Sequence, residues 1–273
     1  MKNTISIGIA LMLGVLPPLT FAQEKDATEA EFEKFRTEME DSNPAELFEM
    51  KGEDIWNEKR GPKNVSLAES CDLGKGVGVV KGAYAAMPRY FADAGAVMDA
   101  ERRIVWCMVE KQGFNFDDIA KKPFQGRNDT SAPDITNLVT YVAMHSKGMP
   151  FAVPLDDPKV KDAYLTGKEI TKYRAGPYDF SCNTCHGVDG KRIRMQNLPN
   201  ISTAAGAIKG VQGWPGYRMT GGIMLTHQWR INDCFRQQRF PEPRYASEVI
   251  TDILTYMTGN ANGQIYNGPG IKR

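Results

Sequence analysis

The segment "CNTCH", residues 182–186, places two thiols and an imidazole at a spacing with specific chemistry. Thiols at its first and fourth positions add to the vinyl groups of a haem, and the histidine that follows directly is placed to bind the iron. A redox dithiol or a zinc pair is the alternative, but the chain has no second CxxC segment and no thioredoxin-like βαβ pattern around this one. Cys182, Cys185 and His186 therefore predict one covalently bound haem c.

The second axial ligand of that iron is not decided by spacing. Methionine is the usual ligand in electron-transfer cytochromes c, and imidazole also binds haem iron well. Candidates downstream of the motif are Met195, Met219, Met224, Met257 and His227. A further candidate, Cys234 in "RINDCF", is indicated by an internal repeat.

Two stretches of the chain, residues 87–108 and 214–235, match at a constant offset, and each contains R-I-x-x-C. The matched pairs include Pro88 and Pro215, Gly95 and Gly222, Arg103 and Arg230, and Cys107 and Cys234. Segments that begin at Thr136 and Thr251 also resemble each other, with the apolar spacing of an amphipathic helix. Upstream, "AESCD" at 68–72 takes the place of "CNTCH". The pattern indicates duplication of a haem domain whose first copy has lost its haem.

This duplication assigns a role to each of the five cysteines. Cys71 is then a leftover attachment thiol and Cys107 a leftover iron ligand, and both point into one vacated pocket, where we expect a disulfide. Two buried free thiols are the alternative. Cys234 has no thiol partner left, and its repeat mate Cys107 sits where an iron ligand should be. We therefore predict Cys234 as the second axial ligand, a stronger electron donor than methionine.

Arg230 precedes Cys234 by one helical turn if the segment is a helix, so its guanidinium and the Cys234 sulfur could face the same side. Arginine binds oxyanions with paired donors. A surface ion pair or a contact with a haem propionate is the alternative role. Further arginines near it are Arg218, Arg236, Arg239 and Arg244. This local basic excess favours a small anion or an acidic partner near the haem.

The elements that must position these residues are expected to be mainly α-helices joined by long loops. Residues 1–22 combine a basic residue, an apolar run and the ending "TFA", the pattern of a signal peptide cleaved after Ala22. That run is short and interrupted by prolines, so we expect no membrane span and a periplasmic protein. Two cytochrome c-like domains are predicted, 23–150 without haem and 151–273 with haem. The net charge of +1 argues against nucleic acid as a partner.

Several segments carry a family resemblance. The sequences "RGPKNVSLAESCDLGKG" from Arg60, "MPRYFADAGAVMDAERRIVWCMVEKQG" from Met87, "SCNTCHG" from Ser181 and "WRINDCFRQQRFP" from Trp229 resemble the SoxA family, cytochrome subunits of the SoxAX complex of bacterial sulfur oxidation. The resemblance spans nearly all of the chain after residue 22, and the single CxxCH makes it similar to the monohaem form. It implies two cytochrome c-like domains related by a pseudo-two-fold axis, the first without haem.

The resemblance also implies a chemistry. Members of the family act as L-cysteine S-thiosulfotransferases, which oxidatively conjugate thiosulfate to a cysteine of the carrier SoxYZ and pass electrons to the smaller cytochrome SoxX in a heterodimer. The residue matching Cys234 ligates the haem and can carry an extra sulfur as a persulfide. The residue matching Arg230 lies beside it in the substrate channel, so both are expected to be catalytic, with Arg230 binding the substrate.

Two other functions stay open at the level of the sequence. A thiosulfate dehydrogenase would form tetrathionate without a carrier and can also use a Cys-ligated haem, although proteins of that kind resemble dihaem chains. A plain periplasmic electron-transfer cytochrome c would retain Met219 or Met224 as the iron ligand. The reaction product and the identity of the second ligand distinguish these possibilities.

Overall fold

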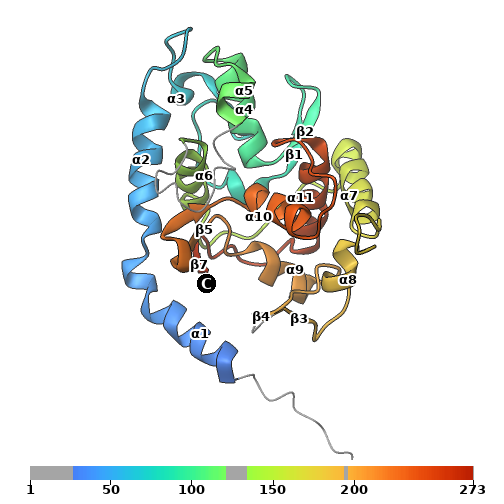
Figure 1. The fold of residues 1–273 in the computed structure, drawn as a ribbon. Helices are drawn as coiled ribbons and strands as arrows, with labels where there is room; N and C mark the ends of the chain where they lie inside the picture. Colours follow the sequence, from blue (N-terminus) through green and yellow to red (C-terminus); the bar gives the residue numbers. More distant parts are fainter. Residues whose placement is uncertain (1–26, 121–133, 194–195, 273) are drawn as a thin grey trace, which may run out of the picture.

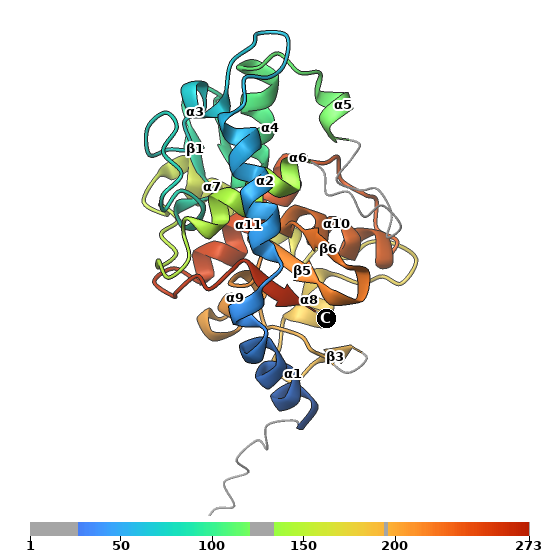
Figure 2. The ribbon, with the colours of Figure 1, turned by 90° about the vertical axis from the view of Figure 1, so that its left-hand side faces the viewer.

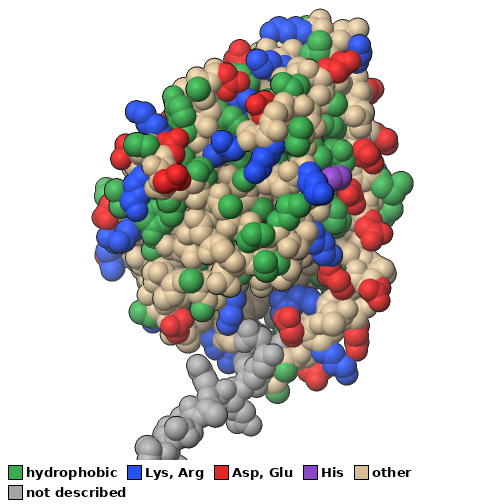
Figure 3. Space-filling view, turned by 180° about the vertical axis from the view of Figure 1, so that it is seen from behind, with side chains coloured by type: hydrophobic (Ala, Val, Ile, Leu, Met, Phe, Trp, Pro, Cys, Tyr) green, Lys and Arg blue, Asp and Glu red, His purple; other side chains and the backbone are tan. Residues whose placement is uncertain are grey.

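The computed structural model describes residues 27–120, 134–193 and 196–272. The predicted signal peptide, residues 1–22, and the candidate ligand Met195 lie outside the described residues. Within them, no helix is long and apolar enough to cross a membrane. Acidic and basic side chains are interspersed over the face seen in Figure 3, as the small net charge suggests.

The described residues form mostly helices, with short strands between them. The α-helices are α1 (Ala27–Glu38), α2 (Ala45–Asn57), α3 (Leu67–Ser70), α4 (Ala100–Glu110), α5 (Phe116–Ala120), α6 (Asp134–Met144), α7 (Pro158–Ile170), α8 (Cys182–His186), α9 (Ala204–Val211), α10 (His227–Gln237) and α11 (Glu248–Asn260). The strands are β1 (Arg89–Phe91), β2 (Ala96–Met98), β3 (Arg192–Ile193), β4 (Gln196–Asn197), β5 (Gly216–Arg218), β6 (Ile223–Leu225) and β7 (Gly270–Lys272). Single 3-10 turns lie at Glu40–Ser42, Tyr84–Ala86 and Met219–Gly221.

Two apolar cores organise these elements, one in each half of the chain. In the first, α6 packs between α2 and α4, and the buried residues include Trp56, Leu67, Ile104 and Leu138. In the second, α11 packs on α7 and α9 around Ile250, Ile253, Tyr256 and Tyr266. Figure 1 shows α6 and α11, the two helices predicted from the repeat, at the centre of these groups. The boundary near residue 150 remains a prediction, because Ala85 and Ala143 contribute to the second core.

The repeat seen in the sequence has the same backbone conformation in both copies. The hairpin β1–β2 and the helix α4 recur as β5–β6 and α10 at the same offset, with equivalent antiparallel registers. The hairpin glycines Gly95 and Gly222 both adopt a left-handed conformation, with φ of 63° and 61°. A residue with a Cβ is strained at that φ, which explains why glycine occupies both positions. Two successive structural units of one kind therefore make up the fold.

The two copies meet where α4 and α10 begin. Asp99 caps α4 and accepts a hydrogen bond from the Gln228 amide at 2.8 Å, while Thr226 caps α10 and donates to the Glu101 carboxylate at 2.8 Å. Each cap residue thus contacts the second residue of the other helix, and the two contacts are exchanged by the repeat. This reciprocity is what a pseudo-two-fold axis between the halves produces. We call these four side chains the axial cluster.

Glu101 is one of the two buried acids of the axial cluster, and burial raises its pKa to about 8. The folded chain then holds a proton that the unfolded chain releases above its ordinary pKa of 4.5. The contribution of this proton to the free energy of unfolding is therefore fully present below pH 4.5. It is lost as the pH rises from there through about 8, by up to ~1.4 kcal/mol per pH unit. The free energy of unfolding, measured by urea denaturation between pH 5 and pH 8, should lose this part of its pH dependence in the Glu101→Gln variant.

The matched control for that experiment is Glu53→Gln on α2, which should keep the parent slope. Asp252, whose pKa is raised by burial to about 6, contributes in the same direction and remains in both variants. A Glu101→Gln variant with the parent slope would show that Glu101 is ionised in the folded chain.

Candidate haem site

The attachment motif forms the short helix α8, which begins because Ser181 and Thr184 make a capping box. The Ser181 hydroxyl accepts from the Thr184 N–H at 3.2 Å, and the Thr184 hydroxyl accepts from the Ser181 N–H at 2.9 Å. Both cysteines are free thiols and partly exposed. Burial, followed by the neighbouring charge of Cys234, raises the pKa of the Cys182 thiol to about 11. Cys234 therefore lies near the attachment helix.

His186 is held in a single tautomer at the end of α8. Its Nδ1 atom lies 2.8 Å from the Pro199 carbonyl oxygen, which can only accept, so Nδ1 carries the proton and Nε2 keeps a free lone pair. Burial lowers the pKa of His186, which keeps the imidazole neutral. A neutral imidazole with an oriented second nitrogen is the form that ligates a metal. No sequence motif predicted this contact of the Pro199 carbonyl.

Cys234 lies on α10, and it is the third free thiol of the described residues. Burial raises its pKa, the nearby Arg230 opposes that shift, and the charges of Asp233 and Cys185 add to it. The helix starts at the Thr226 cap, whose hydroxyl accepts from the Trp229 N–H at 3.1 Å. The segment is a helix, which was the condition for the predicted placement, and α10 carries Arg230 and Cys234 one turn apart.

This set of donors fits a haem. Cys182 and Cys185 are unpaired thiols at the attachment spacing, His186 presents a free nitrogen, and Cys234 lies close enough to both thiols to interact electrostatically with them. No group of three or more His, Cys, Asp or Glu side chains that could hold a separate metal ion occurs in the part of the chain that is described. The site is thus suited to a macrocycle held by thiols and one imidazole.

The other predicted candidates for the second ligand have different surroundings. Met224 and Met257 are buried, Met257 in the second apolar core. His227 is stacked on Trp214 with the ring centroids 5.7 Å apart, and burial lowers its pKa to about 3. Met219 is 41% exposed on the 3-10 turn Met219–Gly221.

Arg230 differs from its repeat mate in its degree of exposure. Arg103 is 1% exposed and makes two bonds to Asp93, at 2.9 and 2.8 Å, while its guanidinium lies over Phe91 and Trp106. Arg230 is 34% exposed and has one long contact, 3.3 Å, with the buried Asp233. The first arginine fills its pocket as a structural residue. The second retains donors for a ligand.

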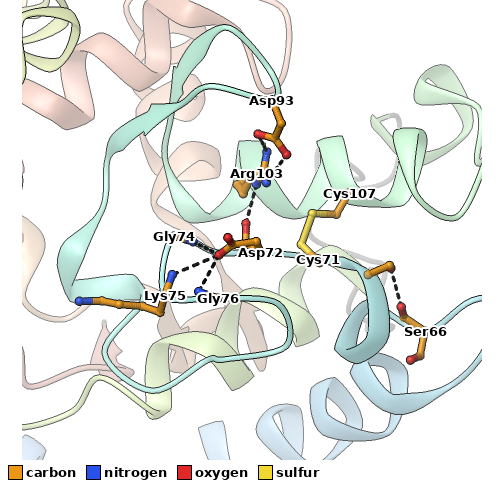
Figure 4. Close-up of a disulfide and its surroundings, with 10 residues drawn as sticks. Ser66, Cys71, Asp72, Gly74, Lys75, Gly76, Asp93, Arg103 and Cys107 are labelled. Atoms are coloured by element: carbon orange, nitrogen blue, oxygen red, sulfur yellow. Dashed lines mark hydrogen bonds and ion pairs between the residues drawn. A yellow bond between two sulfur atoms is a disulfide. The ribbon is translucent and has the colours of Figure 1, made fainter.

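The half without an attachment motif has a disulfide between Cys71 and Cys107. Figure 4 shows it beside the Arg103–Asp93 pair and the loop in which the Asp72 carboxylate accepts from three N–H groups, those of Gly74, Lys75 and Gly76. The Arg103 Nε atom also donates to the Asp72 carbonyl at 2.8 Å. The disulfide and these polar contacts connect α4 to the segment that follows α3.

The position of Cys71 in the repeat differs by one residue from the sequence interpretation. Helix α3 starts at a capping box of Ser66 and Glu69, as α8 starts at one of Ser181 and Thr184. When the caps are matched, Cys71 corresponds to His186 and not to the attachment thiol Cys185. The caps decide the register because they fix where each helix begins. The disulfide thus joins the repeat mates of His186 and Cys234.

Comparison with known proteins identifies the family. The family model described as SoxA/TsdA, cytochrome c domain, matches residues 51–151, which lie in the first half. A protein of Hydrogenophilus thermoluteolus named L-cysteine S-thiosulfotransferase subunit SoxA is 42% identical over 278 residues, covering 100% of both chains. The chain belongs to the SoxA family. A SoxA subunit of Hydrogenobacter thermophilus is 32% identical and covers 84% of this chain and 82% of its own length.

The fold of this SoxA family member is also that of a solved structure. The crystal structure of SoxXA from P. pantotrophus matches with a TM-score of 0.69 at 24% identity, over 88% of this chain and 84% of that chain. The predicted mainly helical fold with cytochrome c-like domains is confirmed by this match together with the family model. A cytochrome c domain implies a haem, which the donor set described above fits.

Some residues of the site were not found from the sequence. Asp233, which is buried and contacts both Arg230 and Arg236, was not considered although it lies between them. Its spacing of three residues from each arginine on one helix is a signal that could have revealed it. The axial cluster depends on tertiary contacts, for which the sequence has no comparable signal.

Proposed function

We propose that this chain is the catalytic subunit of an L-cysteine S-thiosulfotransferase in the periplasm. Its substrates would be thiosulfate and the cysteine thiol of a SoxYZ-like carrier, and its partner a SoxX-like cytochrome, since the solved relative is a SoxXA structure. Relatives that match over most of their length carry the name of this activity. The signal-peptide pattern in residues 1–22 supports export.

In this proposal, Cys182 and Cys185 would hold one haem c covalently, and His186 and Cys234 would bind its iron. When bound, the haem would supply one-electron redox chemistry and would change the reactivity of the Cys234 sulfur. The orientation of His186 is provided by the Pro199 carbonyl. Arg230 binds the sulfonate end of thiosulfate, because a guanidinium offers paired donors to an oxyanion.

The overall reaction balances as an oxidation. A bond forms between the outer sulfur of thiosulfate and the carrier sulfur, the carrier S–H bond breaks, one proton is released and two electrons leave. The outer sulfur of thiosulfate first bonds to the Cys234 sulfur, and the thiosulfate group is then transferred to the carrier thiol. The SoxX-like cytochrome accepts the electrons.

The observation that carries the proposal is that α10 presents Arg230 and Cys234 one turn apart, next to the free thiols of α8. The test is to incubate the purified complex of this chain and its SoxX-like subunit with thiosulfate and the carrier, and to measure the carrier's mass. We expect a thiosulfonate adduct on the carrier cysteine. Tetrathionate as the main product would favour a thiosulfate dehydrogenase. If neither the adduct nor tetrathionate forms, an electron-transfer cytochrome c is the function that remains.

Replacement of Arg230 by glutamine should lower kcat/KM for thiosulfate by about 100-fold, or ~2.7 kcal/mol, because a charge-assisted contact with the oxyanion is lost. Arg236→Gln is the matched control. Arg236 contacts the same buried Asp233 from the next turn and is 61% exposed. That variant should stay within about threefold of the parent. Equal losses in both variants would mean that the Asp233 ion pairs, and not anion binding, account for the effect.

A further inference from the structure

The last strand of the fold brings a second cation toward Arg230. Strand β7 runs parallel to β5, with Lys272 opposite Arg218, as Figure 2 shows for the two strands. The segment is fastened from both sides, since the Gly270 N–H donates to the Pro215 carbonyl at 3.1 Å and the Asn43 amide donates to the Pro269 carbonyl at 2.9 Å. Lys272 is therefore held on an anchored strand.

Aromatic rings connect Lys272 to the start of α10. The Lys272 ammonium lies 5.4 Å from the centroid of the Trp214 ring, and Trp214 stacks on His227 at 5.7 Å with an interplanar angle of 13°. His227 is the first residue of α10, and Arg230 follows it by one turn. The stack thus places Lys272 on the same side of the second half as Arg230.

The charges around Lys272 are mostly positive. Burial, followed by the charges of Arg36 and Arg230, lowers its pKa to about 8, while Glu33 acts in the opposite direction. No carboxylate within the described residues forms an ion pair with the Lys272 ammonium. Two half-buried cations near each other, one without a carboxylate and the other with a single long contact, form a place where an anion is stabilised.

We propose that Lys272 and Arg230 together form the subsite for the sulfonate end of thiosulfate, with Lys272 as a second substrate-binding residue. The inference rests on the proposed function and deepens it. Arg230 supplies a fork of donors to two oxygens, and Lys272 supplies a point charge to the third. A haem propionate is also an oxyanion that these two cations could bind. The experiment must therefore distinguish thiosulfate from a propionate as the anion at this subsite.

The experiment uses the haem-loaded complex and compares Lys272→Gln with Lys272→Arg. Inorganic sulfate, which has an oxygen in place of the outer sulfur of thiosulfate, serves as a non-reacting probe, and its dissociation constant is measured by calorimetry. We expect Lys272→Gln to raise both the KM for thiosulfate and the Kd for sulfate by about tenfold, and Lys272→Arg to stay within about threefold. Lys159→Gln, at the start of α7, is the control and should change neither.

The pH dependence adds a readout that a merely structural role would not move. Sulfate should bind the parent more weakly as the pH rises through about 8, where Lys272 loses its charge, whereas the Lys272→Arg variant should show no such change. The other charged and titratable groups facing Lys272 are Arg36, Glu33, His227, Arg230 and Arg218. His227, with its pKa near 3, does not titrate in this range.

Three results would decide against the inference. Unchanged sulfate binding in Lys272→Gln would remove Lys272 from the anion subsite. A shifted haem midpoint potential or reduced haem loading with unchanged sulfate binding would assign Lys272 to a propionate. A sulfate affinity in the parent that is independent of pH from 7 to 9 would also remove Lys272 from the anion subsite. Because sulfate binding is measured without turnover, a complex that binds sulfate but forms no carrier adduct would contradict the proposed function and leave the subsite in place.

Discussion

Replacement of Cys234 by serine should reduce the rate of thiosulfate conjugation by at least about 1,000-fold, or ~4 kcal/mol in the activation free energy. The thiol is partly buried between α10 and α8, and the neighbouring Arg230 opposes the effect of burial on its pKa. A hydroxyl has nearly the same size but forms no persulfide and is a poor ligand for haem iron. The measurement is the steady-state rate of adduct formation on the carrier.

The control for this variant must show that haem attachment is unaffected. Cys182 and Cys185 remain in place, so the covalent haem content by intact mass should equal that of the parent. The parent's Cys234 peptide should also carry an additional sulfur atom, which the serine variant lacks. A serine variant that retains the parent rate within threefold would exclude Cys234 from the reaction and leave Met219 as the ligand to test next.

Removal of the Cys71–Cys107 disulfide should cost about 3 to 4 kcal/mol of unfolding free energy. The bond closes a loop with a sequence separation of 36, and both residues are fully buried in the first core. A double Cys71→Ala, Cys107→Ala variant should therefore unfold at a distinctly lower urea concentration with a similar slope. The loss falls in the first half, whose sequence has no CxxCH attachment motif.

Activity separates this effect from damage to the site. Under conditions where the double variant is folded, its conjugation rate should remain close to that of the parent, since neither cysteine lies on α8 or α10. The single variants Cys71→Ala and Cys107→Ala should lose a similar amount of stability, because either one opens the loop. A loss below about 1 kcal/mol in all three would mean that the unfolded chain gains little freedom when the bond is absent.

The sequence was sufficient for the parts of the fold that depend on local pattern. The offset between residues 87–108 and 214–235 predicted equivalent segments, and the hairpins and helices α4 and α10 have that equivalence. The helices that begin near Thr136 and Thr251 were predicted from apolar periodicity and are α6 and α11. The CxxCH spacing indicated haem without any structure.

The remaining features depend on contacts between distant segments. The predicted register of Cys71 is wrong by one residue, because the cysteines match at a different offset from the caps Ser66 and Ser181. The caps are recognisable only once the helix starts are known. The pairing of Asp99 with Gln228 joins residues far apart in sequence, and periodicity reports burial but not partners. The roles of Cys234 and Arg230 in catalysis stay predictions.

The axial cluster limits how the two halves could have diverged. In a protein with two identical copies of the first half, the exchanged contacts would bring Asp99 of each copy against Glu101 of the other, so four carboxylates would be buried together. The second half has Thr226 and Gln228 instead, which donate hydrogen bonds to those acids. A chimera built from two first halves should therefore fail to assemble near neutral pH. The halves have become complementary, and an ancestral homodimer would have required a different pair of residues at this axis.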